Sequence, residues 1–175
     1  MSNYATIKPM DIANGLGVRV SVFLSGCPHH CQGCFNAEAW DYDFGLPMTI
    51  QTVEKVRSLL NHPFIQGLTL LGGEPLAPHN VMASVRLATV AKELGKSVWI
   101  YTGYLFQEIL DRAAMDDQYA HVVSLCDVLV DGRFQQDLAD KRLAFKGSAN
   151  QRIIDVSTSL AQGSIVLWEE PYAHH

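Results

Sequence analysis

Short apolar runs with a period of two alternate along this chain with stretches of helical spacing, and this alternation constrains the fold more than any other feature. Every second residue from Val18 to Leu24 is apolar, which predicts a strand over residues 18–24. Apolar residues then recur three and four positions apart and predict a helix over residues 49–61, with Thr49 as its N-cap. Strands that alternate with helices in this way favour an α/β fold with a largely parallel sheet.

The same alternation continues through the rest of the chain. Strands are predicted at residues 68–71, 98–101, 128–130, 152–156 and 165–168, and helices at residues 81–94 and 105–113. Asn80 is the expected N-cap of the second helix and Gly95 its left-handed stop, while Leu105 and Ile109 are expected to face inward. About five or six strands are too few for a complete eight-stranded barrel, so we expect a partial, open (β/α) barrel.

Length and composition fit one globular domain over residues 1–175. The chain has 175 residues, of which 48% are hydrophobic, and it shows no internal repeat or interdomain linker. Residues 156–175 form a possible extra C-terminal segment, expected to cap the open edge of the sheet or to touch a partner. His174 and His175 are either native residues or the remnant of a purification tag.

Charge and hydropathy exclude two classes of partner. The formal net charge is −5 and the basic residues are scattered, so the basic stripe of a nucleic-acid binder is missing. The chain has no run of about 18 apolar residues that could span a bilayer. We therefore expect a cytoplasmic protein with neither nucleic acid nor membrane as a partner.

Three of the four cysteines lie directly after the first predicted strand. Cys27, Cys31 and Cys34 span eight residues, with no fourth cysteine nearby. Protein [4Fe–4S] clusters normally take four cysteine ligands, so three thiolates can hold such a cluster with one iron open to another molecule. Cys126 is expected to be a small buried hydrophobe before a strand, with a fourth cluster ligand as the alternative.

A zinc site is the nearest competing interpretation of these cysteines. Cys27, Cys31 and Cys34, together with His29 or His30, would supply a tetrahedral set of three thiolates and one imidazole. Structural zinc sites, however, usually pair two ligand clusters across a longer stretch of chain. A disulfide is disfavoured, because nothing else indicates a secreted chain. Outside the zinc interpretation, both histidines are expected to face solvent or a partner.

Three further loops are predicted at the edge of the sheet where the cysteines lie. In α/β folds ligands gather where parallel strands end, and Gly72, Gly73 and Glu74 follow the second predicted strand. The two glycines allow close approach of the backbone to a ligand, and the carboxylate can accept hydrogen bonds from an ammonium group. Residues 101–104 and 131–133 end the next two strands and add hydroxyl, carboxylate and guanidinium groups. Taken alone, each of these segments is more simply an ordinary turn.

Together these motifs resemble the radical S-adenosylmethionine (SAM) superfamily, in which three cysteines at this spacing precede a Gly-Gly-Glu-Pro segment. The segments at residues 11–19, 99–104, 127–134 and 145–152 are similar to the activating proteins of anaerobic ribonucleotide reductases, a family within it. The resemblance covers residues 4 to 156 and implies the partial barrel of the radical SAM type. In that family Tyr is expected at position 35 and Pro at position 16, where this chain has Phe35 and Leu16.

The resemblance implies a specific chemistry. The open iron would bind SAM, and the reduced cluster would cleave it to methionine and a 5′-deoxyadenosyl radical, which abstracts hydrogen from a glycine of the reductase and leaves a glycyl radical. The implied cofactors are a [4Fe–4S] cluster and SAM, and the implied partners are the catalytic subunit of the reductase and an electron donor such as reduced flavodoxin. The implied cluster ligands are Cys27, Cys31 and Cys34, and the implied SAM contacts are Gly33, Cys34, Phe35, Gly72, Gly73, Glu74, Thr102 and Asp131.

Three functions remain open from the sequence. The first is an oxidoreductase that activates the anaerobic ribonucleotide reductase. The second is a radical SAM enzyme that acts on another glycyl-radical enzyme or on a small molecule. The third is a zinc-binding structural module without enzymatic activity.

Overall fold

The strand predicted from the alternating pattern lies inside the sheet. β2 (Arg19–Leu24) is buried along almost its whole length, as expected for a strand covered on both faces. It pairs in parallel with β4 (Gly67–Gly72) and antiparallel with β1 (Asn3–Asp11). The last residue of β2, Leu24, therefore delivers the chain into the cysteine loop from the centre of the sheet.

The structure, a computed structural model, describes residues 1–171. The expectations for Tyr172, His174 and His175 lie outside these residues. Within the described part of the chain, none of the helices has the length and apolar character needed to cross a membrane.

Seven strands form one mixed sheet in the order β3-β1-β2-β4-β5-β6-β7. The remaining strands are β3 (Leu46–Pro47), β5 (Ser97–Tyr101), β6 (Val128–Asp131) and β7 (Arg152–Asp155). β2, β4, β5 and β6 run parallel, whereas β1, β3 and β7 join antiparallel at the two edges. The α/β class is thus confirmed, but the expected five or six strands were too few, because β1 and β3, both at one antiparallel edge, were not predicted.

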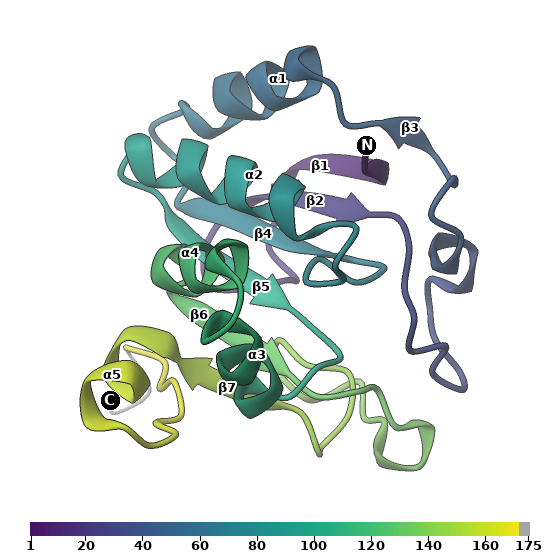
Figure 1. Cartoon of the computed structure of the whole chain (residues 1–175), viewed down its shortest axis with the longest axis vertical. Coiled ribbons are helices and arrows are strands. Elements are labelled where there is room, and N and C mark those ends of the chain that lie inside the picture. The colour runs from purple at the N-terminus through teal and green to yellow at the C-terminus, as the bar shows by residue number, and fades with distance from the viewer. Residues whose placement is uncertain (172–175) are drawn as a thin grey trace.

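The longer helices cover one face of this sheet (Figure 1). They are α1 (Ile50–Leu60), α2 (Val81–Glu93), α3 (Phe106–Ala113) and α4 (Asp117–Leu125), and α5 (Val156–Gln162) follows β7. Two 3₁₀ turns, η1 (Ala37–Trp40) and η2 (Gln136–Leu138), lie in the loops after β2 and β6. α1 contacts α2, and α4 contacts both α2 and α3, so the helices form a layer beside the sheet.

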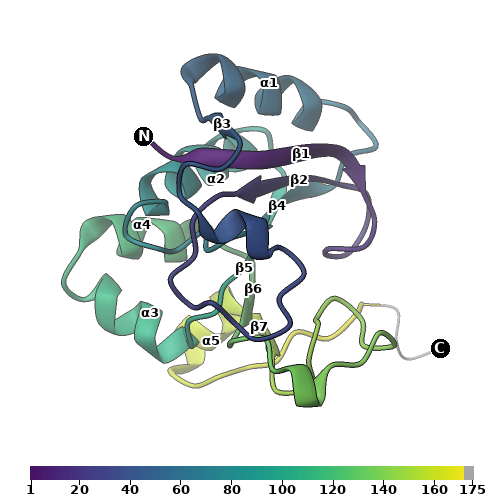
Figure 2. The ribbon, with the colours of Figure 1, turned by 90° about the vertical axis from the view of Figure 1, so that its right-hand side faces the viewer.

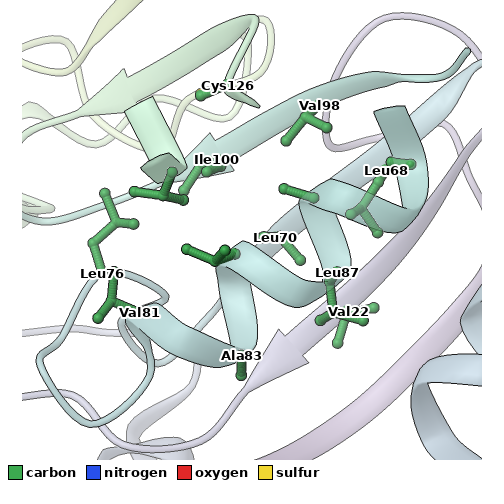
Figure 3. Close-up of a cluster of buried hydrophobic side chains, with 14 of the residues drawn as sticks. Val22, Leu68, Leu70, Leu76, Val81, Ala83, Leu87, Val98, Ile100 and Cys126 are labelled. Atoms are coloured by element: carbon green, nitrogen blue, oxygen red, sulfur yellow. The ribbon is translucent and has the colours of Figure 1, made fainter. Parts of the chain in front are cut away.

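The main core lies between the helices and the sheet. Leu70 and Ile100 of the parallel strands meet Leu87 of α2 there, each at most 1% exposed (Figure 3). Cys126 belongs to this core, where burial raises the pKa of its thiol and its sulfur donates to the carbonyl of Val128. The structure thus contradicts the alternative of a fourth cluster ligand.

The opposite face of the sheet carries a smaller aromatic cluster. Trp99 packs edge-on against Phe145 and Trp168, with ring centroids 5.4 and 5.0 Å apart. Trp168 comes from the C-terminal tail, whose Leu167 forms a β-bridge to Ile154 of β7. The tail therefore covers the edge of the sheet, one of the two roles expected for it. The strand predicted at residues 165–168 was wrong, because the pairing is limited to this bridge.

Two local predictions were also wrong. Asn80 precedes α2 as expected, but its side chain does not cap the helix, because its amide donates to the carbonyls of Ser25 and Glu74. Leu105 precedes α3 and is 50% exposed, whereas Phe106 and Ile109 point into the core.

Candidate functional site

Four loops surround one cavity at the carboxyl edge of the parallel strands. The cavity has a volume of about 360 Å³, within the usual range for small-molecule sites. Figure 2 looks onto this edge, with the loops after β2 and β6 on the viewer's side. Its lining includes Cys27, Cys31, Cys34 and Phe35 after β2, Gly72, Gly73 and Glu74 at the end of β4, Tyr101, Thr102 and Gly103 at the end of β5, and Gly132 and Phe134 after β6. The structure thus brings all four predicted loops together.

Backbone hydrogen bonds converge on the cysteine sulfurs. The N–H groups of His29 and His30 donate to Cys27, and the N–H of Phe134 donates to Cys31. Burial nevertheless raises the pKa of Cys27 to about 11, and the nearby charge of Glu74 adds to this effect. Burial also raises the pKa of Cys31. Both thiols therefore keep their protons in the metal-free chain, and metal binding would release them.

The three site cysteines fit the ligand set of an iron–sulfur cluster. All are partly exposed, none is in a disulfide, and all three line the cavity. Each cysteine of a cluster binds a different iron, so the sulfurs stand apart around the cluster. Within residues 1–171, no three Cys, His, Asp or Glu side chains are close enough together to hold a single metal ion.

Gly73 lets the loop after β4 lie directly against the cysteine loop. A Cβ added at this position would lie 2.5 Å from the carbonyl oxygen of Gly26. The amide of Gly73 donates to Leu24 and that of Glu74 to Gly26, each at 2.7 Å. The glycine pair therefore fixes the register between the two loops, and its lack of side chains leaves backbone open to the cavity.

The carboxylate of Glu74 is fully buried and is bound from three loops. Its Oε1 accepts from the amide of Leu76 and the hydroxyl of Thr102, and its Oε2 from the amide of Gly103. The ring of His29 completes the set, with its Nε2 2.8 Å from Oε2. The side chain of His29 is only 3% exposed, so the expectation that it faces solvent was wrong. His30 is exposed and stacks on Trp40.

Asp131, a predicted SAM contact, does not itself line the cavity. Its carboxylate is fully buried, accepts from the amide of Phe106 and forms an ion pair with Arg152. It thereby fixes the start of α3 and the pairing of β6 with β7. Gly132, the next residue, lines the cavity itself.

Gly33 and Phe35 occupy the outer part of the cysteine loop. Gly33 has φ +77°, and a Cβ there would lie 2.9 Å from the side chain of Gln136. Phe35 is 80% exposed at the cavity and its ring lies 5.8 Å from that of Phe134. The cysteine loop therefore rests on the segment that contains η2.

Two segments that carried the family resemblance also line the cavity, although no role was predicted for them. Ala13 and Asn14 come from the loop before β2, and Phe145, Lys146, Gly147 and Gln151 come from the segment before β7. The resemblance of these segments to the family was the only signal in the sequence that they belong to the site. Hydrophobic periodicity predicts helices and strands, and it could not predict that these irregular loops lie beside the cysteines.

Comparison with known proteins agrees with this geometry. Residues 13–154 match the family described as 4Fe-4S single cluster domain. The chain is 42% identical over 153 residues to the anaerobic ribonucleoside-triphosphate reductase-activating protein of Escherichia coli K12, covering 85% of this chain and 96% of the relative. The protein of the same name from Salmonella typhi is 43% identical over 85% of this chain and 95% of its own. That of Enterobacteria phage T4 is 38% identical over 86% and 92%. The chain belongs to the family of anaerobic ribonucleoside-triphosphate reductase-activating proteins.

Proposed function

We propose that this protein activates an anaerobic ribonucleoside-triphosphate reductase by forming a glycyl radical on its catalytic subunit. The three cysteines and the Gly72–Gly73–Glu74 loop line one cavity at the carboxyl edge of the parallel strands. The names of the relatives supply the partner, and the family match supplies the cluster.

Cys27, Cys31 and Cys34 would hold a [4Fe–4S] cluster and leave one iron for SAM. When both groups are bound, they supply the 5′-deoxyadenosyl radical that removes hydrogen from a glycine, and the tasks of the protein are binding and placement. The backbone around Gly33, Cys34 and Phe35 is proposed to meet the adenosyl portion. That proposal is supported by the position of Cys34 and Phe35 on the cavity wall.

The loop after β4 is proposed to receive the methionyl amino group. Gly72 and Gly73 bring its backbone to the cavity, and Glu74 fixes the loop. Thr102 and Asp131 are proposed to act from the next two strand ends. Thr102 supports Glu74 through its hydroxyl, and Asp131 holds the loop that carries Gly132.

We further propose that the sheet forms an open barrel of the radical SAM type. The confinement of the longer helices to one face and the position of the cavity at the strand ends support this arrangement. A reduced protein such as flavodoxin is the expected electron donor.

The decisive experiment combines the reconstituted protein with the purified reductase. After anaerobic reconstitution with iron and sulfide, we expect absorbance near 400 nm, SAM cleavage on reduction, and a glycyl radical in electron paramagnetic resonance (EPR) spectra of the mixture. The Cys31→Ala variant should remain folded and form no radical. A colourless protein that binds zinc and unfolds on loss of Cys31 would instead identify a structural zinc module. SAM cleavage without a radical on the reductase would indicate another substrate.

A further inference from the structure

We infer that His29 is a positioning residue, whose imidazole ties the cysteine loop to Glu74 and thereby sets the cluster ligands against the loop proposed to bind SAM. The inference deepens the proposed function and rests on it for the part that concerns SAM. We call the contact between His29 Nε2 and Glu74 Oε2, 2.8 Å long, the His29–Glu74 latch.

His29 holds the two loops through both its backbone and its side chain. Its backbone N–H donates to the sulfur of Cys27, while its ring donates to Glu74. Because both bonds come from one residue, the position of the Cys27 sulfur is coupled to that of the carboxylate. The ring is also held edge-on against Tyr104, with centroids 4.6 Å apart. Its place is thus set by the loop after β5 as well.

The structure makes room for this ring at Gly103. A Cβ at that position would lie 2.7 Å from Nε2 of His29, closer than real Cβ contacts come. The φ of Gly103 is not in the left-handed region, so backbone conformation does not call for glycine there. We therefore attribute the missing side chain to the imidazole that occupies its space.

The His29–Glu74 latch also limits which further hydrogen bonds the carboxylate of Glu74 can accept. An ionised carboxylate offers about four acceptor positions, and four donors already occupy those of Glu74. A direct bond from its carboxylate to the amino group of SAM would require one donor to leave. We assign Glu74 instead to holding Leu76, Thr102, Gly103 and His29 in place, which leaves backbone of its loop to face the cavity.

The first test measures hydrogen exchange of backbone amides in the full-length, metal-free chain. His29→Phe keeps a ring beside Tyr104 but removes the donor, whereas His29→Gln keeps a donor near the position of Nε2. We expect residues 27–31 to exchange about tenfold faster in the Phe variant, as for loss of a hydrogen bond to a charged group. The Gln variant should exchange within about twofold of the wild type.

His30→Phe is the matched control, since it makes the same substitution one residue away on a ring that stacks on Trp40. Its exchange should match the wild type, and amides of β4 serve as the internal reference for global stability. Unchanged exchange in His29→Phe, or equally fast exchange in His29→Gln, would overturn the latch.

A second pair of variants keeps the inference testable if His29→Phe fails to fold. Gly103→Ala should displace the ring and speed exchange of residues 27–31. In a His29→Ala background the same change should have no further effect, because no ring remains to displace. Additive effects of Gly103→Ala and His29→Ala would contradict the inference.

The last measurement uses the reconstituted protein. His29→Phe should retain the iron content of the wild type, bind SAM about tenfold more weakly and alter the EPR spectrum of the reduced cluster with SAM, while His29→Gln restores both properties. Unchanged SAM affinity and spectrum would reject the positioning role. If the wild type takes up no cluster, the proposed function fails, and the exchange data still decide whether the latch exists.

Discussion

At the residue scale, buried polar side chains hold the irregular segments around the cavity. Asp11 is 6% exposed and accepts hydrogen bonds from the hydroxyl of Ser21 at 2.6 Å, the amide of Asn14 at 2.7 Å and the backbone of Ala13 at 2.9 Å. Burial alone would raise its pKa, but these bonds outweigh burial and hold the pKa of Asp11 below its usual value. The carboxylate thus keeps Ala13 and Asn14 on the cavity wall.

Asp11→Asn should lower the free energy of unfolding by about 1–3 kcal/mol near neutral pH. Because the folded pKa lies below the unfolded value of 3.8, the stabilisation by the carboxylate is fully present above about pH 5 and is lost as pH falls through the folded pKa. The difference between wild type and variant, measured in urea from pH 7 to pH 3, should therefore shrink below about pH 4. Asp43→Asn, at an exposed carboxylate, is the control. A difference independent of pH would contradict this account.

Sequence reasoning predicted the cysteines and the Gly72–Gly73–Glu74 loop because both are contiguous motifs at strand ends. It could not predict the partner of His29, since Glu74 is 45 residues away and the contact depends on how the loops fold. Asn80 fits a cap by residue type. Its side-chain amide instead donates to the carbonyls of Ser25 and Glu74. These contacts depend on the tertiary fold, so the preference of asparagine for helix N-caps could not predict them.

At the scale of elements, α1 begins with the cap that its sequence predicted. The hydroxyl of Thr49 accepts from the amide of Thr52 at 3.2 Å, and the hydroxyl of Thr52 accepts from the amide of Thr49 at 3.3 Å. This reciprocal pair satisfies two amides that the first turn would otherwise leave unbonded. None of these atoms belongs to the cavity at the cysteines.

Thr49→Ala should lower the free energy of unfolding by about 1 kcal/mol, the usual effect of losing a helix N-cap. Urea denaturation monitored by circular dichroism measures it, and SAM cleavage should keep the wild-type rate. Ser58→Ala, at an exposed position of the same helix, should be neutral or slightly stabilising. Equal losses in the two variants would show that the cap does not stabilise α1.

The elements that escaped prediction have weak or short patterns. β1 is an antiparallel strand with an irregular register, and all of its residues except Asp11 are exposed or only partly buried, so they do not alternate cleanly. α4 has nine residues and buries Tyr119, Val122 and Val123. Three apolar positions in so short a segment do not make a clear helical pattern, and the polar residues before it are typical of a loop. The parallel strands were predicted because burial on both faces leaves continuous apolar runs.

At the scale of the whole molecule, the C-terminal tail completes the face of the sheet opposite the helices. Trp168 contacts Trp99 and Phe145, and its amide donates to the carbonyl of Ile153 at 2.8 Å. The tail thus joins the end of the chain to β5 and β7, which are not neighbours in the sheet.

Trp168→Ala should lower the free energy of unfolding by roughly 2 kcal/mol, less than for a fully buried tryptophan because the side chain is partly exposed. Thermal and urea unfolding would measure the loss. Leu167→Ala, at a neighbour that is 57% exposed, should change stability by less than about 1 kcal/mol. A Trp168 variant as stable as the Leu167 variant would mean that the tail does not contribute to the fold.

The partial exposure of the three site cysteines has a consequence for where such a protein can work. Cys27, Cys31 and Cys34 are all reachable from the cavity, and Phe35 beside them is 80% exposed. A cavity that is proposed to receive a glycine of another protein is also open to the much smaller dioxygen molecule, and accessible thiolates are the ones that oxidise. Air would therefore destroy a cluster held here, and a geometry that admitted a large substrate would restrict the activity of the protein to oxygen-free conditions.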